Sequence, residues 1–322
     1  MSNKTARLYD YIDIDIKMVH KIFAEYDSKI KINKLELIPE GLSTSNYIVH
    51  TNEPQIKYLL KIYPENGGNS EIEVSSYKYA KRYVVVPNIY FFDNTKKVYN
   101  KPYIIMDYID GITLKEYIIK NKRFPEKMVY NIANSLALLH NREYENRALL
   151  DKHLNIEKVL PSIKAVYEKG LNSFAGNHIN SKIKKDILEF ITQNEDMLKK
   201  LDSQFVYSHG DFNPSNILVD NKESIWFIDF EYSLSSSIYL DIGKFFRDRT
   251  DIDKYMTKEI YDNFFRGYNS SAKILLTNDW IKLVRLMDMI SMLGLINKKS
   301  VPDEWVSEIE EAIIKTMSIL GD

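Results

Sequence analysis

Three oxygen-bearing side chains near residue 220 have types and a spacing that could bind a cation and move a proton. Asp211 follows a His-Gly pair, Asn216 comes five residues later before an apolar run, and Asp229 closes a second apolar run. The turn residues at 220–223 predict a hairpin between the two runs, whose open ends would bring Asn216 and Asp229 together. A carboxylate beside an amide oxygen suits Mg²⁺, and Asp211 could accept the proton of a substrate hydroxyl.

The composition excludes several other kinds of site. The 322 residues contain no cysteine, which excludes disulfides, thiolate zinc sites, iron–sulfur clusters and cysteine nucleophiles. Lys and Arg number 44 against 45 Asp and Glu, so no global positive field would recruit nucleic acid or an anionic membrane. Neither of the glycine-rich nucleotide motifs GxGxxG and GxxxxGK[ST] occurs.

The same sequence sets expectations about location and partners. The first residues lack the apolar segment of a secretory signal, and no apolar run approaches the roughly 20 residues that span a bilayer. We therefore expect a cytoplasmic protein with no membrane partner, no nucleic-acid partner and no obligate protein partner.

The pattern of apolar residues changes near residue 107. Short β-branched and aromatic runs predict an antiparallel sheet at 34–39, 46–51, 57–63, 88–92 and 102–108. A helix is expected over 69–82, capped by Asn69 or Ser70. Helical spacing then predicts helices at 113–121, 125–140, 153–169, 180–201 and over most of 240–322. We predict an N-terminal β-rich lobe, residues 1–107, and a C-terminal helical lobe, residues 108–322.

The spacing of Asp211, Asn216 and Asp229 resembles the catalytic loop of protein kinases. The form His-Gly-Asp, Asn and Ile-Asp-Phe-Glu is more similar to the aminoglycoside phosphotransferase and choline kinase family. This resemblance extends over about residues 34–296. It implies an α+β, two-lobed protein-kinase-like fold, with a small antiparallel β lobe and a larger mainly helical lobe. It also implies an ATP- or GTP-dependent transfer of the γ-phosphate to a hydroxyl of a small molecule.

The family's catalytic roles transfer to matching positions. Asp211 resembles the catalytic base, and Asn216 and Asp229 resemble the ligands of one or two Mg²⁺ ions. His209 and Gly210 would shape the turn before Asp211. In a downstream segment, Asp241 resembles a carboxylate that supports the catalytic loop. His140 ends a helical pattern and is expected to be a packed residue without chemistry.

The family's nucleotide contacts have counterparts upstream. Residues 40–46 resemble the phosphate loop, with Ser43 as the chosen contact, and Lys61 occupies the position of the phosphate-binding lysine. A helix glutamate should hold that lysine; the spacing favours Glu73, and Glu71 is the alternative. The adenine is expected to contact backbone groups of the connecting segment that consists of Met106, Asp107, Tyr108 and Ile109.

Two departures argue against a protein kinase. Gly210 stands where regulated protein kinases carry Arg, and Asp229 is followed by Phe-Glu in place of Phe-Gly. The acceptor we favour is an aminoglycoside or similar antibiotic. A choline or ethanolamine-type metabolite kinase is the alternative, since the Ile-Asp-Phe-Glu-Tyr string is shared with choline kinases. A non-catalytic nucleotide-binding protein is a third interpretation, and intact Asp211, Asn216 and Asp229 speak against it.

Each acceptor requires its own surroundings. A polycationic aminoglycoside needs facing carboxylates, for which the candidates are the acidic stretch 303–311 and Asp248, Asp251 and Asp253; a solvated helix face is the ordinary interpretation of that stretch. A quaternary ammonium needs an aromatic cage, for which Tyr232, Trp280 and Trp305 are the candidates.

Overall fold

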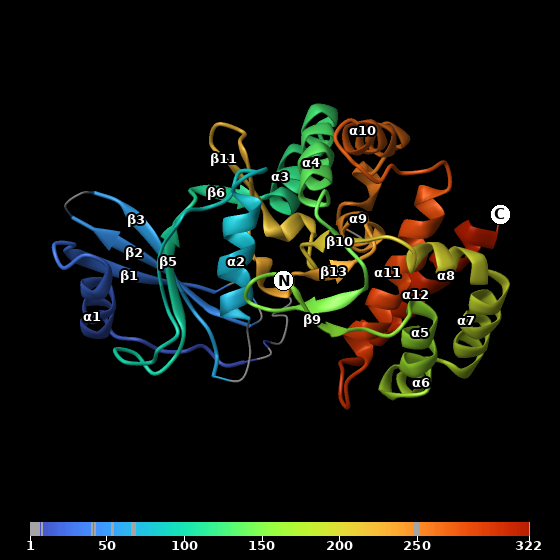
Figure 1. Cartoon of the computed structure of the whole chain (residues 1–322), viewed down its shortest axis with the longest axis horizontal. Coiled ribbons are helices and arrows are strands. Elements are labelled where there is room, and N and C mark those ends of the chain that lie inside the picture. Colours follow the sequence, from blue (N-terminus) through green and yellow to red (C-terminus); the bar gives the residue numbers. More distant parts are fainter. Residues whose placement is uncertain are drawn as a thin grey trace. The chain divides into compact units, whose positions relative to one another are not determined.

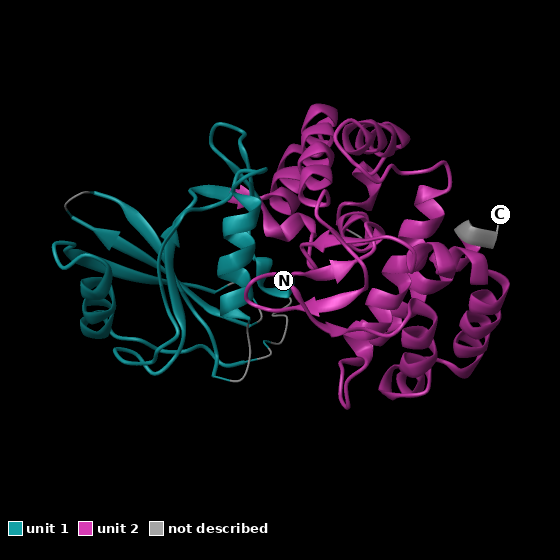
Figure 2. Cartoon of the chain, in the orientation of Figure 1, with its two compact units in different colours: residues 1–111, 218–232 teal, residues 112–217, 233–322 magenta. Residues whose placement is uncertain are grey.

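The computed structural model describes residues 7, 9–39, 41, 43–52, 55–65, 69–247 and 251–321. The chain divides into two compact units (Figure 2). The first unit consists of residues 1–111 together with 218–232, and the second consists of residues 112–217 together with 233–322. The segment 218–232 thus packs in the same unit as the N-terminal third of the chain, although it lies more than a hundred residues further along.

The first unit is built on a five-stranded antiparallel sheet (Figure 1). Its strands, in spatial order, are β1 (Ile32–Ile38), β2 (Ser45–Thr51), β3 (Lys57–Ile62), β5 (Tyr103–Asp107) and β4 (Ile89–Asp93). Each pair of neighbours is antiparallel. The strands lie within about two residues of the predicted runs, so the predicted antiparallel sheet is confirmed.

The two faces of this sheet are covered by different helices. Leu60 and Ile62 of β3 join an apolar core with Phe23 of α1 (Ile16–Tyr26), a helix that the sequence pattern did not reveal. Because side chains alternate along a strand, Lys61 points to the opposite face. There it meets α2 (Ser70–Ala80), which begins close to the predicted start and carries two glutamates in its first turn.

The second stretch of the first unit is the predicted hairpin, formed by β11 (Ile217–Asp220) and β12 (Ile225–Phe227), followed by the short 3₁₀ helix η2 (Phe230–Tyr232). The carboxylate of Asp220 holds its turn by accepting hydrogen bonds from the backbone N–H groups of Lys222 and Ser224, both at 2.8 Å. The hairpin passes close to β6 (Gly111–Thr113): a Cβ on Gly111 would lie 2.6 Å from the carbonyl oxygen of Val219, which excludes a side chain there.

The second unit is mainly helical. Its helices are α3 (Leu114–Asn121), α4 (Glu126–Leu139), α5 (Ile163–Leu171), α6 (Phe174–His178), α7 (Ser181–Gln193), α8 (Glu195–Leu201), α9 (Tyr239–Phe245), α10 (Lys258–Asn269), α11 (Trp280–Ile296) and α12 (Asp303–Gly321). Thr113 caps α3 in a reciprocal capping box with Glu116, as its sequence position suggested. Two short 3₁₀ helices, η1 (Pro214–Asn216) and η3 (Asp253–Tyr255), complete the helical elements.

Two of the expected helices differ from the structure. The helix predicted over 153–169 begins only at Ile163, where Ser162 is its N-cap and accepts a hydrogen bond from the Ala165 N–H at 3.3 Å. The helix predicted over 180–201 is interrupted at Asn194, which separates α7 from α8.

The second unit also contains a small antiparallel sheet that the sequence pattern did not reveal. Its order is β7 (Glu143–Tyr144), β10 (Phe205–Ser208), β13 (Leu234–Ser236), β8 (Ala148–Leu150) and β9 (Ile156–Val159). These strands have two to four residues, which is too short for an alternating pattern to be distinguished from a loop. The sheet matters for the site because β10 leads directly into the turn at 209–211.

Among the described residues, no helix combines the length and the apolar character that crossing a bilayer would require.

The contact between α10 and α4 gives a prediction about packing. A Cβ on Gly267 of α10 would lie 2.4 Å from the carbonyl oxygen of Tyr130 in α4, whereas a Cβ on Gly170 of α5 would meet nothing within 4 Å. We expect Gly267→Ala to lower the free energy of unfolding by about 1–3 kcal/mol through overpacking. Gly170→Ala should raise it by about 0.5–1 kcal/mol, because alanine favours the helix. Chemical denaturation of both variants checks this, and similar effects of the two substitutions would contradict it.

Candidate active site

One buried ammonium group in the first unit lies among three carboxylates. Lys61 Nζ donates to Glu73 Oε1 at 2.8 Å and to Asp229 Oδ1 at 2.7 Å. Carboxylate oxygens of Glu73, Asp229 and Glu231 all lie within 4.8 Å of one another. Lys61, Glu73 and Glu231 are at most 5% exposed, so this cluster is largely removed from water. The structure therefore brings together three of the predicted site residues and adds Glu231.

The first turn of α2 decides which glutamate meets the lysine. Glu73 is fully buried, and its second carboxylate oxygen accepts a hydrogen bond from the Tyr63 hydroxyl. Glu71 lies on a partly exposed face, where it accepts a hydrogen bond from Asn94 Nδ2 at 3.0 Å. The partner of Lys61 is thus Glu73, the residue that the sequence spacing favoured.

The electrostatics of this cluster are those of a site short of positive charge. Burial alone would lower the pKa of Lys61, but the charges of Asp229 and Glu73 hold that pKa well above its usual value. Burial raises the pKa of Glu231 to about 7, against the opposing effect of the Lys61 charge. Among the described residues, Glu231 Oε2 has no hydrogen-bond partner. Oxygen donors with excess negative charge fit a hard divalent cation such as Mg²⁺.

Asp229 holds its position in an unfavourable backbone conformation. Its φ is +67°, a left-handed value that costs a non-glycine residue on the order of 1–3 kcal/mol and persists only where the surroundings enforce it. The Asp229 N–H donates to the Tyr77 hydroxyl at 3.1 Å, and the Tyr77 ring packs edge-on against Phe230 at 4.9 Å. Asn69 Nδ2 donates to the Glu231 carbonyl at 3.2 Å. Asn69, which precedes α2, and Tyr77 within α2 thus fix residues 229–231.

The predicted phosphate loop is described in part, since Glu40 and Leu42 lie outside the described residues. Ser43 is 8% exposed, and its hydroxyl shares a hydrogen bond of 3.1 Å with the Tyr232 hydroxyl. Arg7 ties the loop to the N-terminal segment by donating to the carbonyls of Gly41 at 2.6 Å and Thr44 at 2.8 Å. The contact between Ser43 and a nucleotide stays a prediction.

The segment predicted to contact adenine follows the end of β5. Met106 is buried, and the Asp107 N–H already donates to the Asn88 carbonyl at 2.9 Å. Tyr108 and Ile109 are half-buried and follow the last residue of the strand. The contact between these four positions and adenine stays a prediction.

In the second unit, the structure brings Asp211 and Asn216 together. Asn216 Nδ2 donates to Asp211 Oδ2 at 2.8 Å and to the Asp211 carbonyl at 2.9 Å, so its amide oxygen is the atom that could coordinate a cation. Lys244 Nζ, from α9, donates to Asp211 Oδ1 at 3.2 Å. Burial alone would raise the pKa of Asp211, but the Lys244 and His209 charges and the bonds from Lys244 and Asn216 hold it below its usual value. Asp211 is therefore an ionised and oriented hydrogen-bond acceptor.

A fully buried carboxylate holds the turn that presents Asp211. Asp241 accepts hydrogen bonds from the N–H groups of His209 at 2.7 Å and Gly210 at 2.9 Å, and it lies 3.1 Å from His140 Nε2. Gly210 has a φ of +83°, which favours glycine at this position. His140 is buried at the end of α4, and its other ring nitrogen lies 2.8 Å from the Tyr268 hydroxyl. His140 is thus a packed residue that also contacts the support of the turn.

The predicted site residues thus form two clusters. Lys61, Glu73 and Asp229 belong to the first unit, and Asp211 and Asn216 belong to the second. The prediction that Asn216 and Asp229 bind one cation spans the two units and stays a prediction.

Sequence reasoning missed Lys244 and Glu231 as site residues. Lys244 lies three residues after Asp241, a spacing that places both on one face of a helix. Glu231 belongs to the Ile-Asp-Phe-Glu string, which was interpreted only as a family signal. In both cases the motif containing the residue was recognised, but the direction of its side chain depends on how the motif packs.

The carboxylates suggested for acceptor recognition differ in whether they already have a positively charged partner. Asp251 forms an ion pair with Lys115, and Asp253 lies 3.6 Å from Lys315 Nζ, so neither stands without a counter-charge; Asp248 lies outside the described residues. Four carboxylates of α12 are exposed: Asp303, Glu304, Glu308 and Glu311.

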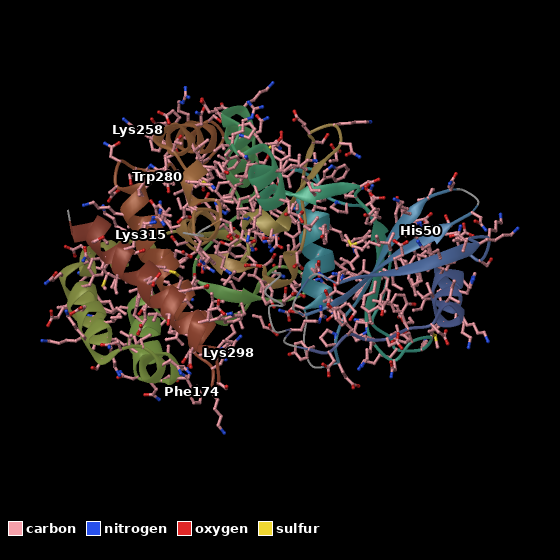
Figure 3. All side chains as sticks on the ribbon, turned by 180° about the vertical axis from the view of Figure 1, so that it is seen from behind. His50, Phe174, Lys258, Trp280, Lys298 and Lys315 are labelled. Carbon is pink, nitrogen blue, oxygen red and sulfur yellow. The ribbon has the colours of Figure 1, made fainter. Side chains whose placement is uncertain are left out.

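Trp280, at the start of α11 (Figure 3), is 5% exposed and stacks on Phe264 with a ring separation of 5.9 Å. It is a core residue of the second unit, and Tyr232 belongs to the first. The expectation that Trp280 lines an aromatic cage is therefore not supported by its burial.

Comparison with known proteins identifies the family. Residues 34–276 match the phosphotransferase enzyme family, abbreviated APH. This range is most of the chain, so the protein belongs to that family and is a small-molecule phosphotransferase, as the resemblance implied. A search of curated proteins gives no match.

Solved structures confirm the two-lobed kinase-like fold. An ethanolamine kinase from Plasmodium vivax is 23% identical with a TM-score of 0.61, covering 88% of this chain and 81% of that one. The choline kinase LicA from Streptococcus pneumoniae is 17% identical with a TM-score of 0.64, covering 94% and 99%. A spectinomycin phosphotransferase in complex with ADP and spectinomycin is 14% identical with a TM-score of 0.62, covering 95% and 99%.

The two glutamates of α2 provide a matched test of the buried cluster. We expect Glu73→Gln to lower the free energy of unfolding by about 3 kcal/mol, because it removes one partner of a buried ion pair. Glu71→Gln makes the same chemical change two residues away, on a partly exposed face, and should cost less than about 0.5 kcal/mol. Denaturant unfolding of both variants measures the difference, and equal losses would show that burial of the Lys61–Glu73 pair has no special energetic role.

Proposed function

We propose that this protein transfers the γ-phosphate of ATP or GTP to a hydroxyl group of a small molecule, with an aminoglycoside or similar antibiotic as the acceptor. The observation that carries the proposal is the Asp211 carboxylate, which is ionised and held by Asn216 and Lys244 in a turn anchored by Asp241. A carboxylate held in this way can align a substrate hydroxyl and take its proton during phosphoryl transfer.

The proposed reaction uses the residues of both units. Lys61, fixed by Glu73, neutralises the α- and β-phosphates of the nucleotide. The acceptor oxygen forms its bond to the γ-phosphorus while the bond between that phosphorus and the β–γ bridging oxygen breaks. The nucleoside diphosphate leaves with the electron pair, and the hydroxyl proton goes to Asp211. Positioning and electrostatics supply most of the rate acceleration in such transfers.

A divalent metal fits the donors that the chain offers. The orphaned buried oxygen of Glu231 and the carboxylates of Glu73 and Asp229 show a cluster with more negative charge than Lys61 can neutralise. We propose that Asp229 and the amide oxygen of Asn216 hold Mg²⁺. When bound, the ion would neutralise charge on the transferred phosphoryl group.

Two acceptor classes are considered. A polycationic acceptor needs several negative charges facing it, and the exposed carboxylates of α12 are the candidates for them. A choline or ethanolamine-type acceptor is the second candidate, favoured by the Glu231-Tyr232 pair after Asp229 and by the likeness in fold to the ethanolamine kinase.

A panel of acceptors tests the proposed function directly. Phosphate transfer from ATP and GTP to spectinomycin, other aminoglycosides, choline, ethanolamine and simple sugars should single out one class. We expect Asp211→Ala to lower turnover of that acceptor by at least about 10³-fold while nucleotide affinity changes little, since the residue acts on the hydroxyl. Nucleotide affinity measured by calorimetry is the control. Unchanged turnover in Asp211→Ala would overturn the role given to this carboxylate.

The metal site makes a separate prediction. Asn216→Ala and Asp229→Ala should each raise the Mg²⁺ concentration required for half-maximal turnover by about tenfold or more, because each removes one oxygen ligand. Asp196→Ala removes an exposed carboxylate of the second unit and serves as the control, with no change expected. A Mg²⁺ titration of the three variants is the measurement. If both site variants match the control, the metal is held elsewhere.

A further inference from the structure

One cation beside Asp211 has no role in the reaction described so far. Lys244 Nζ lies 3.2 Å from Asp211 Oδ1, and the side chains of the pair are 19% and 31% exposed. We propose that Lys244 is a further catalytic residue, whose ammonium group contacts the phosphoryl group as it reaches the acceptor oxygen. The inference rests on the proposed role of Asp211 as the group that receives the hydroxyl proton.

Helix α9 places the Lys244 side chain beside Asp211. Asp241 and Lys244 are three residues apart and so lie on one face of the helix. Asp241 accepts from the N–H groups of residues 209 and 210, and Lys244 reaches the side chain of residue 211. A single helix face therefore contacts three consecutive residues of the turn.

The position of α9 is itself fixed by close packing on α11. A Cβ on Gly243 would lie 3.1 Å from both the Asp288 Cβ and the Val284 carbonyl oxygen. Such a close approach leaves α9 little freedom to rotate, because neighbouring backbone atoms would clash. The ammonium of Lys244 is thus held beside Asp211 by the fold of the second unit, in contrast to a lysine whose side chain extends into solvent.

A second cation close by shows what distinguishes Lys244. Arg247 donates from Nε and Nη2 to Asp288 Oδ1 at 3.0 and 2.7 Å, and Asp288 is 4% exposed. The positive charge of Arg247 is therefore neutralised by the buried Asp288 carboxylate. Within the part of the chain that the structure describes, the carboxylate paired with Lys244 is Asp211, the group that changes during the reaction.

Simple geometry connects Lys244 with the reacting atoms. A hydroxyl that donates to Asp211 Oδ1 lies about 2.7 Å from that oxygen, and Lys244 Nζ lies 3.2 Å from the same oxygen, so the acceptor oxygen comes within about 6 Å of the ammonium. A phosphoryl oxygen bound to the acceptor can then come within hydrogen-bonding distance of Lys244 Nζ. When the hydroxyl proton moves to Asp211, the carboxyl loses its charge, and the ammonium can give its hydrogen bond to a phosphoryl oxygen. This interaction is stronger in the transition state than before it.

The test compares three variants: one removes the positive charge of Lys244, one keeps that charge, and one removes the charge of a lysine elsewhere on the surface. Lys244→Met should lower kcat by about 10²–10³-fold, as loss of a transition-state donor does, with the KM for ATP changed less than about threefold. Lys244→Arg should retain activity within about tenfold, because it keeps the charge. Lys164→Met removes a surface lysine paired with Glu195 and should behave as the unaltered protein. Turnover is measured with ATP and the acceptor found in the panel, and with water as acceptor in slow ATP hydrolysis.

A double variant separates contact with the phosphoryl group from orientation of Asp211. If Lys244 touches the phosphoryl group, Lys244→Met should lower the residual turnover of Asp211→Ala by at least about tenfold more. No further loss in that background would overturn the proposal. So would a folded Lys244→Met protein with unchanged kcat. If Lys244→Met does not fold, Lys244→Gln, which keeps an N–H donor without the charge, takes its place under the same criteria.

Failure of this inference differs from failure of the proposed function. If Lys244 has no catalytic role, Asp211→Ala still loses its turnover while Lys244→Met keeps it. If the proposed function is wrong, Asp211→Ala keeps its activity, or no acceptor in the panel is phosphorylated.

Discussion

The buried ammonium of Lys61 is the interaction on which the first unit depends. It joins β3, α2 and the segment after β12, three parts of the chain that are far apart in sequence. Taking an ammonium group out of water costs several kcal/mol unless hydrogen-bonded carboxylates compensate it. Three carboxyl groups lie close together at Lys61 where one charge would balance the ammonium, and the pKa of one of them, Glu231, is raised to about 7. The surplus suits a protein that receives a further cation together with a polyphosphate.

The second unit also depends on a buried charge, which here is negative. Asp241 is a buried carboxylate, and it is stabilised by backbone N–H groups and His140 in place of a lysine. Burial would raise its pKa, but the hydrogen bond and charge of His140, the His209 charge and the bond from Gly210 hold the pKa below its usual value. The Asp241 carboxylate fixes the turn at 209–211, and the side chain of Asp211 at the end of this turn stays 31% exposed.

The sequence predicted the parts of the site that depend on local spacing. Asn216 follows Asp211 by five residues, and a short 3₁₀ turn is enough to bring the two side chains together. Glu73 was preferred over Glu71 because its distance along the chain to Pro87 matches the family spacing, and the structure pairs Glu73 with Lys61 and Glu71 with Asn94.

The parts that were missed depend on tertiary packing. Lys244 is 33 residues from Asp211, and its direction follows from how α9 packs on α11. The position of Glu231 beside Lys61 depends on the contact between η2 and the start of α2, where Asn69 donates to the Glu231 carbonyl. The small sheet of the second unit was missed for a different reason, since strands of two to four residues carry no periodic signal.

The residues predicted to recognise the acceptor are the ones whose surroundings in the structure differ most from the prediction. Trp280 belongs to an aromatic cluster in the core, and Asp251 and Asp253 have lysine partners, so composition alone overstated both an aromatic cage and an acidic wall. The ammonium group of Lys244 is a cation that lies beside Asp211. A cationic acceptor would therefore have to place its positive groups away from the reacting hydroxyl. Its hydroxyl, and not its charge, would lie beside Lys244, where positive charge favours the incoming phosphoryl group.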